Sequence, residues 1–313
     1  MGKLATVALI LIVSVVVQLG APASTTVLAS TTVLSSTAAL TSTAALTGHP
    51  PVVLVHGYTT RGSLCEGINL ASYWRGAETE LTVRRNIPAA DVLPVSFYKC
   101  DTNGVDITGS GPGTDYPTTR TSGGAHPRAG YTNDASIVQI ARDLAWFIHN
   151  EFTRAGRPVY AVGHSMGGLV IREALRRVQI RDPAFPPALD VRIALTIATP
   201  HTGWAKECHA NTQCAEMTPG SRFLADLRTN RRPQGSNTTA WWAMGSEDDG
   251  KTLLCDGIPT DSAMAIRGVH LIYVDPCYRH CQYLNDDAQE RDAEGSLALR
   301  GRHSLAMLGH VLR

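Results

Sequence analysis

The strongest constraint on the fold is a glycine-rich turn between a strand pattern and a helix pattern. Gly163-His164-Ser165-Met166-Gly167 follows the apolar run Val159–Val162 and precedes an apolar helical segment, Leu169–Val178. A sharp strand-to-helix turn strains the backbone of Ser165, and side chains two residues before or after it would collide. The serine hydroxyl then projects above the sheet at a helix N-terminus, where backbone N–H groups favour developing negative charge. We therefore expect Ser165 to be a catalytic nucleophile.

Strand and helix patterns alternate from residue 50 to the end of the chain. Apolar residues at i, i+3, i+4 spacing predict a helix from about Ala135 to Thr153, which Asp134 can cap. Residues 104–130 are rich in Gly, Thr and Pro and are interpreted as a long surface loop. The alternation favours one α/β domain, residues 50–313, with a mostly parallel central sheet and helices on both faces. The remaining short apolar runs predict strands at Val52–Val55, Val92–Phe97, Val191–Ile197, Ala240–Met244 and Val269–Val274.

The first 49 residues have a different composition, because no charged residue lies between Lys3 and Arg61. The apolar run Leu4–Leu19, followed by Ala21-Pro22-Ala23, predicts a signal peptide over residues 1–23 and hence secretion. An uncleaved anchor is the alternative, although the run is shorter than the roughly 20 residues that span a bilayer. Residues 24–49 contain a repeated hexamer rich in Ser, Thr and Ala and are interpreted as a low-complexity linker, with a short packed element as the alternative.

The charge balance argues against a nucleic-acid partner. The chain has 28 Lys+Arg, 27 Asp+Glu and a formal net charge of +1. Such a chain has no electrostatic preference for a charged polymer, which suits a neutral substrate. We also expect the protein to be a monomer. No zinc-site spacing or EF-hand is present, so we expect no cofactor and no metal, although spare carboxylates could bind a structural Ca²⁺.

A second motif predicts an oxyanion hole. The apolar strand Val52–Val55 runs into His56-Gly57-Tyr58, and Gly57 allows close approach of a substrate oxygen. The backbone N–H of Tyr58 would then join that of Met166 in binding a developing oxyanion. His56 itself can be a structural histidine beneath this loop, because the N–H of its neighbours carries the chemistry.

At these two motifs the chain resembles the α/β-hydrolase superfamily, and more closely the secreted bacterial lipases and esterases of triacylglycerol lipase type. Ile197–Gly203 is similar to their "TPH-x-G" turn, and Cys214–Leu224 is similar to the segment that follows it. The resemblance covers Pro50 to about Leu284 and implies the α/β-hydrolase fold and a serine triad that cleaves carboxylic esters.

The remaining triad members follow from the chain order serine, acid, histidine on this fold. His280 lies after the last predicted strand, and its "H-x-x-L" continuation resembles that of lipases. For the acid, Asp256 lies in a segment that resembles the lipase acid loop, whereas Asp248 lies directly after the predicted strand Ala240–Met244. We favour Asp256 and keep Asp248 as the alternative, because geometry decides which carboxylate reaches the histidine.

The substrate is expected to be a small-molecule or lipid ester, which forms an acyl-enzyme with Ser165. An acyltransferase, or a hydrolase of polyesters, could use the same triad, and a non-catalytic binding module would need a broken one. The insert at 203–236 could be an amphipathic lid that contacts a lipid interface or an ordinary covering helix.

Seven cysteines in an exported protein predict disulfides. Order along the chain suggests Cys65–Cys100 and Cys208–Cys214. Cys255 could pair with Cys277 or Cys281, which would tie the acid loop to the histidine loop.

Overall fold

The computed structural model divides the chain into two compact units, Met1–Leu46 and Thr47–Arg313. The predicted signal peptide and all but the last two residues of the predicted linker lie outside the described residues, so both stay predictions. Everything below concerns the second unit. The structure describes residues 48–59, 67–112, 130–204, 211–228, 238–246, 261–273, 280–284, 293–295 and 304–312.

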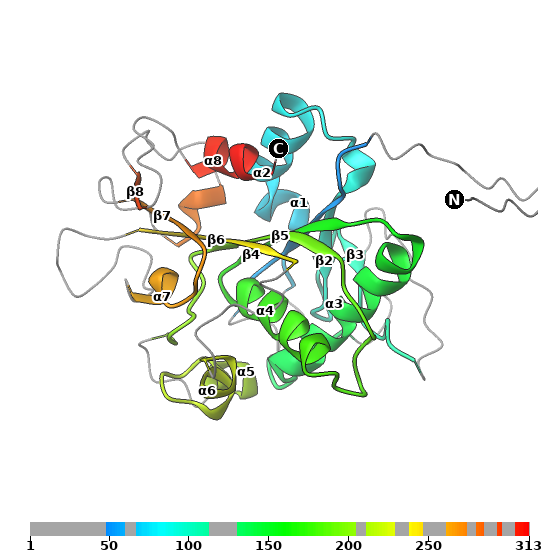
Figure 1. Cartoon of the computed structure of the whole chain (residues 1–313), viewed down its shortest axis with the longest axis vertical. Helices are drawn as coiled ribbons and strands as arrows, with labels where there is room; N and C mark the ends of the chain where they lie inside the picture. The colour runs from blue at the N-terminus through cyan, green and yellow to red at the C-terminus, as the bar shows by residue number, and fades with distance from the viewer. Residues whose placement is uncertain are drawn as a thin grey trace, which may run out of the picture. The chain divides into compact units, whose positions relative to one another are not determined.

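One sheet forms the centre of this unit (Figure 1). It has eight strands in the order β3-β2-β1-β4-β5-β6-β7-β8. The first seven strands in this order pair in parallel, and β8 pairs antiparallel with β7. This confirms the predicted mostly parallel α/β sheet. The strands are β1 Val52–Val55, β2 Val92–Ser96, β3 Val105–Asp106, β4 Val159–His164, β5 Val191–Ile197, β6 Ala240–Ser246, β7 Val269–Tyr273 and β8 Ala293–Gly295.

Helices cover both faces of the sheet, with α3 and α4 on one side and α1, α2 and α8 on the other (Figure 1). Alternate residues of β1 face opposite layers, so Val53 and Val55 belong to one hydrophobic core and Val52 and Leu54 to the other. The α-helices are α1 Leu70–Tyr73, α2 Arg75–Thr79, α3 Ile137–Glu151, α4 Met166–Gln179, α5 Thr212–Glu216, α6 Arg222–Arg228, α7 Asp261–Met264 and α8 Ser304–Val311. A π-helix forms η1 Glu80–Arg84, and 3-10 helices form η2 Ala89–Asp91, η3 Thr153–Ala155 and η4 Gln282–Leu284.

Two local predictions were wrong. Helix α3 is capped by Ser136, whose side chain accepts from the N–H of Val138 in a capping box with Gln139, and Asp134 lies outside the helix. The region interpreted as a surface loop contains β3, which extends the sheet beyond β2. Val105 and Ile107 are buried there, so the first residues of this region belong to the core.

The strand order reverses direction at β1. From β1 the chain adds β2 and β3 on one side, then returns to place β4 on the other side. Such a switch point leaves a crevice at the carboxyl ends of the two strands, where ligands bind in open α/β sheets. No helix within the described ranges has the length and apolar character that a bilayer crossing requires.

Candidate active site

The two predicted motifs meet at this switch point. In the parallel register of β1 and β4, Val55 lies opposite Gly163, so the residues that follow each strand emerge side by side. A Cβ added to Gly57 would lie 2.7 Å from Cβ and 3.1 Å from Oγ of Ser165. Gly57 is therefore needed because its backbone lies directly against the serine side chain.

Ser165 has the strained conformation that the motif predicts, with φ 56° and ψ −129°. It is the N-cap residue of α4 and is partly exposed, and its N–H donates to the Ile197 carbonyl at 2.8 Å. A Cβ on Gly163 would lie 2.5 Å from the N of Gly168, as expected for a tight turn. A Cβ on Gly167 would instead lie 2.0 Å from the Val55 carbonyl oxygen, so strand β1 rather than the turn itself excludes a side chain there.

The predicted oxyanion donors lie on either side of this serine. Met166 is the first residue of α4, and first-turn N–H groups have no acceptor within their own helix. The Gly57 carbonyl accepts from Nδ1 of the buried His56 at 2.9 Å. Because a trans peptide directs its C=O and N–H to opposite sides, this bond turns the N–H of Tyr58 away from the core. No acceptor for that N–H is found among the residues that the structure describes.

His56 is structural and forms a buried pair beneath the loop. Its Nε2 lies 3.0 Å from Oδ2 of Asp101, both side chains are 0% exposed, and its ring stacks on Phe97. Both ring nitrogens of His56 thus face oxygen atoms, the Gly57 carbonyl and the Asp101 carboxylate. Burial alone would raise the pKa of Asp101, but His56 and the backbone N–H groups of Ile68 and Tyr98 hold it below its ordinary value.

The Tyr58 side chain contacts the segment that follows β5. Its hydroxyl accepts from Nδ2 of Asn211 at 2.8 Å, and its ring lies 6.3 Å from that of Trp204. Trp204 in turn donates its backbone N–H to the carbonyl of Met217 at 2.8 Å. Tyr58 and Trp204 are both partly exposed and so can contact a substrate.

The described part of the 203–236 insert is a covering layer. Its buried side chains belong to the same hydrophobic core as α3 and α4, which favours the covering-helix interpretation over a detached lid for these residues. The side chains that do so are Met217, Leu224 and Leu227.

His280 lies beside the residue that precedes the nucleophile. The rings of His280 and His164 have centroids 4.8 Å apart, and the His280 carbonyl accepts from Nε2 of His164 at 2.7 Å. The Ser165 hydroxyl forms no hydrogen bond within the described residues. Bonds of this kind are often long in unliganded sites and tighten only around a substrate. The histidine turn is thus next to the serine, whereas its role as base stays a prediction.

Both candidate acids, Asp256 and Asp248, lie outside the described residues. The strand that precedes them ends at Ser246, whose hydroxyl donates to the Tyr273 carbonyl at 3.1 Å, at the end of β7. The segments that lead to the acid and to His280 therefore start next to each other at the carboxyl edge of the sheet. The choice between the two carboxylates stays open.

Cys100 and Cys214 are disulfide-bonded. Their predicted partners, Cys65 and Cys208, lie outside the described residues, so both pairings stay predictions. Cys281 carries a thiol, and burial raises its pKa. The alternative pairing of Cys255 with Cys281 is therefore not formed.

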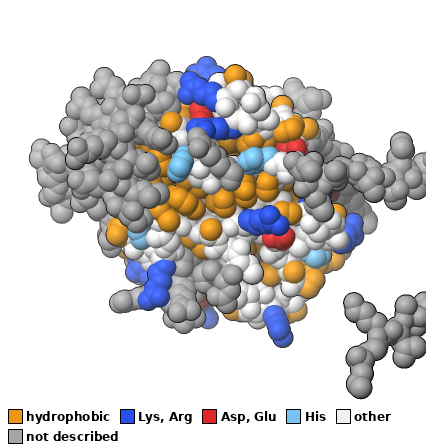
Figure 2. Space-filling view, turned by 45° about the horizontal axis from the view of Figure 1, so that its top comes forward, with side chains coloured by type: hydrophobic (Ala, Val, Ile, Leu, Met, Phe, Trp, Pro, Cys, Tyr) orange, Lys and Arg blue, Asp and Glu red, His pale blue; other side chains and the backbone are white. Residues whose placement is uncertain are grey.

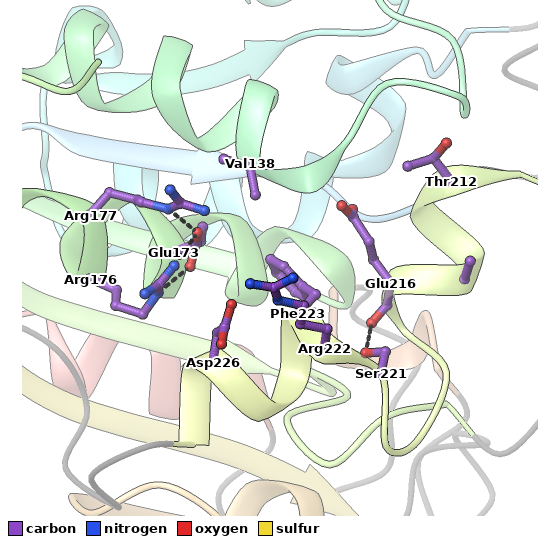
Figure 3. A pocket seen from close by; sticks show the side chains of 11 residues that line it. Val138, Glu173, Arg176, Arg177, Thr212, Glu216, Ser221, Arg222, Phe223 and Asp226 are labelled. Carbon is purple, nitrogen blue, oxygen red and sulfur yellow. Dashed lines mark hydrogen bonds and ion pairs between the residues drawn. The ribbon is translucent and has the colours of Figure 1, made fainter. Parts of the chain in front are cut away.

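A cavity of about 460 Å³ lies along the side of α4 and contains none of the predicted site residues. Figure 3 shows Arg176 and Arg177 converging on the carboxylate of Glu173, at 2.7 and 2.6 Å, so these charges already have partners. On the face shown in Figure 2, hydrophobic side chains predominate over charged ones and histidines lie among them. Among the described residues, no three metal-ligating side chains are grouped as a metal site requires.

Sequence reasoning missed two residues that hold the loop after β1. Asp101 follows β2 and pairs with His56, and Tyr73 at the end of α1 accepts the Gly57 N–H at 3.2 Å. A lone acid after the neighbouring parallel strand was a signal for Asp101. No sequence pattern marks Tyr73.

The sequence matches the model of the alpha/beta hydrolase family over residues 52–301. Among solved structures, phospholipase PlaB from Legionella pneumophila in complex with thio-NAD is 11% identical, with TM-score 0.43, 68% of this chain covered and 44% of that one. Bacillus licheniformis lipase BlEst2 in its propeptide form is 15% identical, with TM-score 0.41 and coverage of 76% and 47%. A gene product of Listeria innocua is 16% identical, with TM-score 0.44 and coverage of 76% and 90%. This chain spans less than half the length of the first two. No curated protein matches it significantly.

Proposed function

Because this chain belongs to the alpha/beta hydrolase family, we propose that it is a secreted serine hydrolase that cleaves carboxylic esters of lipase or esterase type. The observation that carries the proposal is the strained Ser165 at the switch point, against which the backbone of Gly57 lies. The neighbouring turn that contains His280 supplies a base from the expected place in the chain.

In the proposed mechanism His280 takes the proton from the Ser165 hydroxyl as its oxygen attacks the ester carbonyl carbon. The tetrahedral oxyanion accepts from the N–H groups of Tyr58 and Met166, each worth about 3 kcal/mol in comparable sites. His280 then gives the proton to the leaving alcohol, and an acyl-enzyme forms. Water then gives a proton to His280 and attacks the acyl carbonyl carbon. The bond to the Ser165 oxygen breaks, His280 returns the proton to that oxygen, and the acid leaves.

Asp256, with Asp248 as the alternative, would orient His280 and stabilise its cationic form. Each step needs only protein groups and water, so no cofactor is required. The partly exposed Tyr58 and Trp204 offer apolar contacts for an acyl chain, and the near-neutral composition suits an uncharged ester or lipid. Secretion rests on the predicted signal peptide, and the bonded Cys100 and Cys214 fit an oxidising compartment.

The test is hydrolysis of p-nitrophenyl esters by the full chain and by the Ser165→Ala variant. Ser110→Ala removes a hydroxyl that donates to the Ile107 carbonyl, and serves as the matched control. We expect Ser165→Ala to lose a factor of about a thousand or more in kcat, and the control to remain near wild type. Activity of Ser165→Ala within tenfold of wild type would overturn the assignment.

The acyl chain decides among the ester classes. A series from acetate to palmitate, measured in solution and as an emulsion, separates an esterase from a lipase that works at an interface. Release of soluble products from a polyester film tests for a polyester hydrolase that uses the same triad. Formation of a new ester with an added alcohol tests for an acyltransferase. Because the described part of the 203–236 insert is packed into the core, we expect no jump in rate when the substrate becomes emulsified.

A further inference from the structure

A buried histidine, His164, which is 1% exposed, links the segments of the candidate site through hydrogen bonds. Its Nδ1 is hydrogen-bonded to the Tyr73 hydroxyl, and its Nε2 to the His280 carbonyl at 2.7 Å. The same hydroxyl accepts the N–H of Gly57 at 3.2 Å. A continuous chain of hydrogen bonds thus runs from the loop after β1, through α1 and the end of β4, to the histidine turn.

The chemistry of the partners fixes the direction of each bond. The His280 carbonyl can only accept, so Nε2 of His164 carries the hydrogen. Nδ1 of the neutral ring therefore accepts, and the Tyr73 hydroxyl donates to it. That leaves the Tyr73 oxygen to accept from Gly57. Burial, with the neighbouring His280, holds the pKa of His164 well below its ordinary value, and burial raises the pKa of Tyr73, so neither group is charged near neutral pH.

Each end of the chain fixes a group that the proposed mechanism uses. At one end, the hydrogen bond from the Gly57 N–H to Tyr73 fixes the orientation of the peptide group before Gly57. The hydrogen bond from His56 to the Gly57 carbonyl fixes the orientation of the peptide group after it. At the other end the bond to the carbonyl holds the backbone of His280 beside Ser165. These groups come from four distant parts of the sequence, so the packing of one element cannot align them.

The neutral state of His164 also matters for charge. Its ring centroid lies 4.8 Å from that of His280, the residue that would become cationic when it takes the serine proton. A second cation at that distance would oppose the proton transfer. The Nε2–H form, held by bonds at both nitrogens, keeps the base next to an uncharged neighbour.

We propose that Tyr73 and His164 are positioning residues, which align His280 and the oxyanion loop with Ser165 through this hydrogen-bond chain. The proposal rests on the proposed function. Neither side chain is assigned contact with the substrate. Their effect is therefore expected in kcat and in the reactivity of the serine, with little change in KM.

The experiment compares Tyr73→Phe with Tyr160→Phe in the full chain. Tyr160 is a buried tyrosine near the start of β4, at the opposite end of this strand from His164. Its variant therefore removes one buried tyrosine hydroxyl away from the site. The readouts are kcat and KM for p-nitrophenyl acetate, the rate of covalent labelling by a fluorophosphonate, and the Tm. We expect Tyr73→Phe to lose about tenfold in kcat and in labelling rate, with KM within threefold and with no larger loss of Tm than Tyr160→Phe.

A second pair of variants tests the other half of the chain. His164→Leu cannot donate to the His280 carbonyl, whereas the amide of His164→Gln can. We expect kcat of the leucine variant to be about a hundredfold below wild type, and kcat of the glutamine variant to be about tenfold above that of the leucine variant. Such recovery by a restored donor is not expected if His164 only fills space, and equal activities of the two folded variants would overturn its role.

Failure of this proposal is distinguishable from failure of the proposed function. If Ser165→Ala abolishes labelling while Tyr73→Phe labels and turns over as fast as Tyr160→Phe, the positioning role is overturned and the hydrolase assignment stands. If Ser165→Ala labels like wild type, the proposed function is overturned, and the positioning role with it.

Discussion

Replacing Asp101 with asparagine tests whether its buried contact with His56 holds the loop after β1. The Asp101 and His56 side chains are both 0% exposed, and the carboxylate also accepts three backbone N–H groups. Breaking a buried pair by removing one partner costs about 3–5 kcal/mol, because the other group stays buried without its partner. That is a large share of the roughly 5–15 kcal/mol that stabilises a typical domain. For a domain of this size the cost corresponds to a fall in Tm of about 6–20 °C.

The assay is urea unfolding of the wild type and of Asp101→Asn at neutral pH, followed by circular dichroism. Asp91→Asn is the matched control, because the Asp91 carboxylate lies 3.5 Å from Arg157 and these side chains are 29% and 48% exposed. A surface pair of this kind contributes about 0–1 kcal/mol. Equal losses of unfolding free energy in the two variants would refute the reasoning.

The same pair predicts a pH dependence. The folded-state pKa of Asp101 is lowered, so its contribution is fully present above the unfolded pKa of about 3.9 and is lost as the pH falls through the folded value. The stabilisation of wild type over Asp101→Asn should therefore become smaller below about pH 4, as the Asp101 carboxylate is protonated. A difference that grows on acidification would contradict this sign.

Three further predictions follow from individual contacts. Gly167→Ala would place a methyl group 2.0 Å from the Val55 carbonyl oxygen, so we expect a loss of more than about 3 kcal/mol, seen as low soluble yield and a reduced urea midpoint. Ser136→Ala removes the cap of α3 and should cost about 1 kcal/mol in urea unfolding, with no change in kcat. Tyr58→Phe keeps the backbone N–H and should retain kcat within about threefold, whereas Tyr58→Pro removes that donor and should lower kcat by about 10²–10³ in the ester assay.

The sheet and the serine turn could be predicted because their signals are local. The apolar runs mark β1, β4 and β5, and the glycines around Ser165 mark positions where an added side chain would clash with neighbouring atoms. Strand β3 was missed because it is only Val105–Asp106, too short to show a pattern within a Gly/Thr-rich region. The start of α3 was misplaced because Asp134 and Ser136 are both capping residues, and the reciprocal bond of Gln139 decides for Ser136.

The supporting residues of the site could not be predicted in the same way. Tyr73 lies on a four-residue helix, and its hydroxyl reaches Gly57 and His164 only through the packing of α1 against the sheet. Asp101 meets His56 only because β1 and β2 are neighbours in the sheet. Such contacts depend on strand order, which a single sequence does not encode locally.

The central claim is that Ser165 is the nucleophile, and covalent labelling tests it most directly. The full chain is treated with a fluorophosphonate, and the modified residue is located by peptide mass spectrometry. A single adduct on Ser165, formed in step with the loss of ester hydrolysis, is the predicted result. An adduct on another residue, or full inactivation with Ser165 unmodified, would contradict the account.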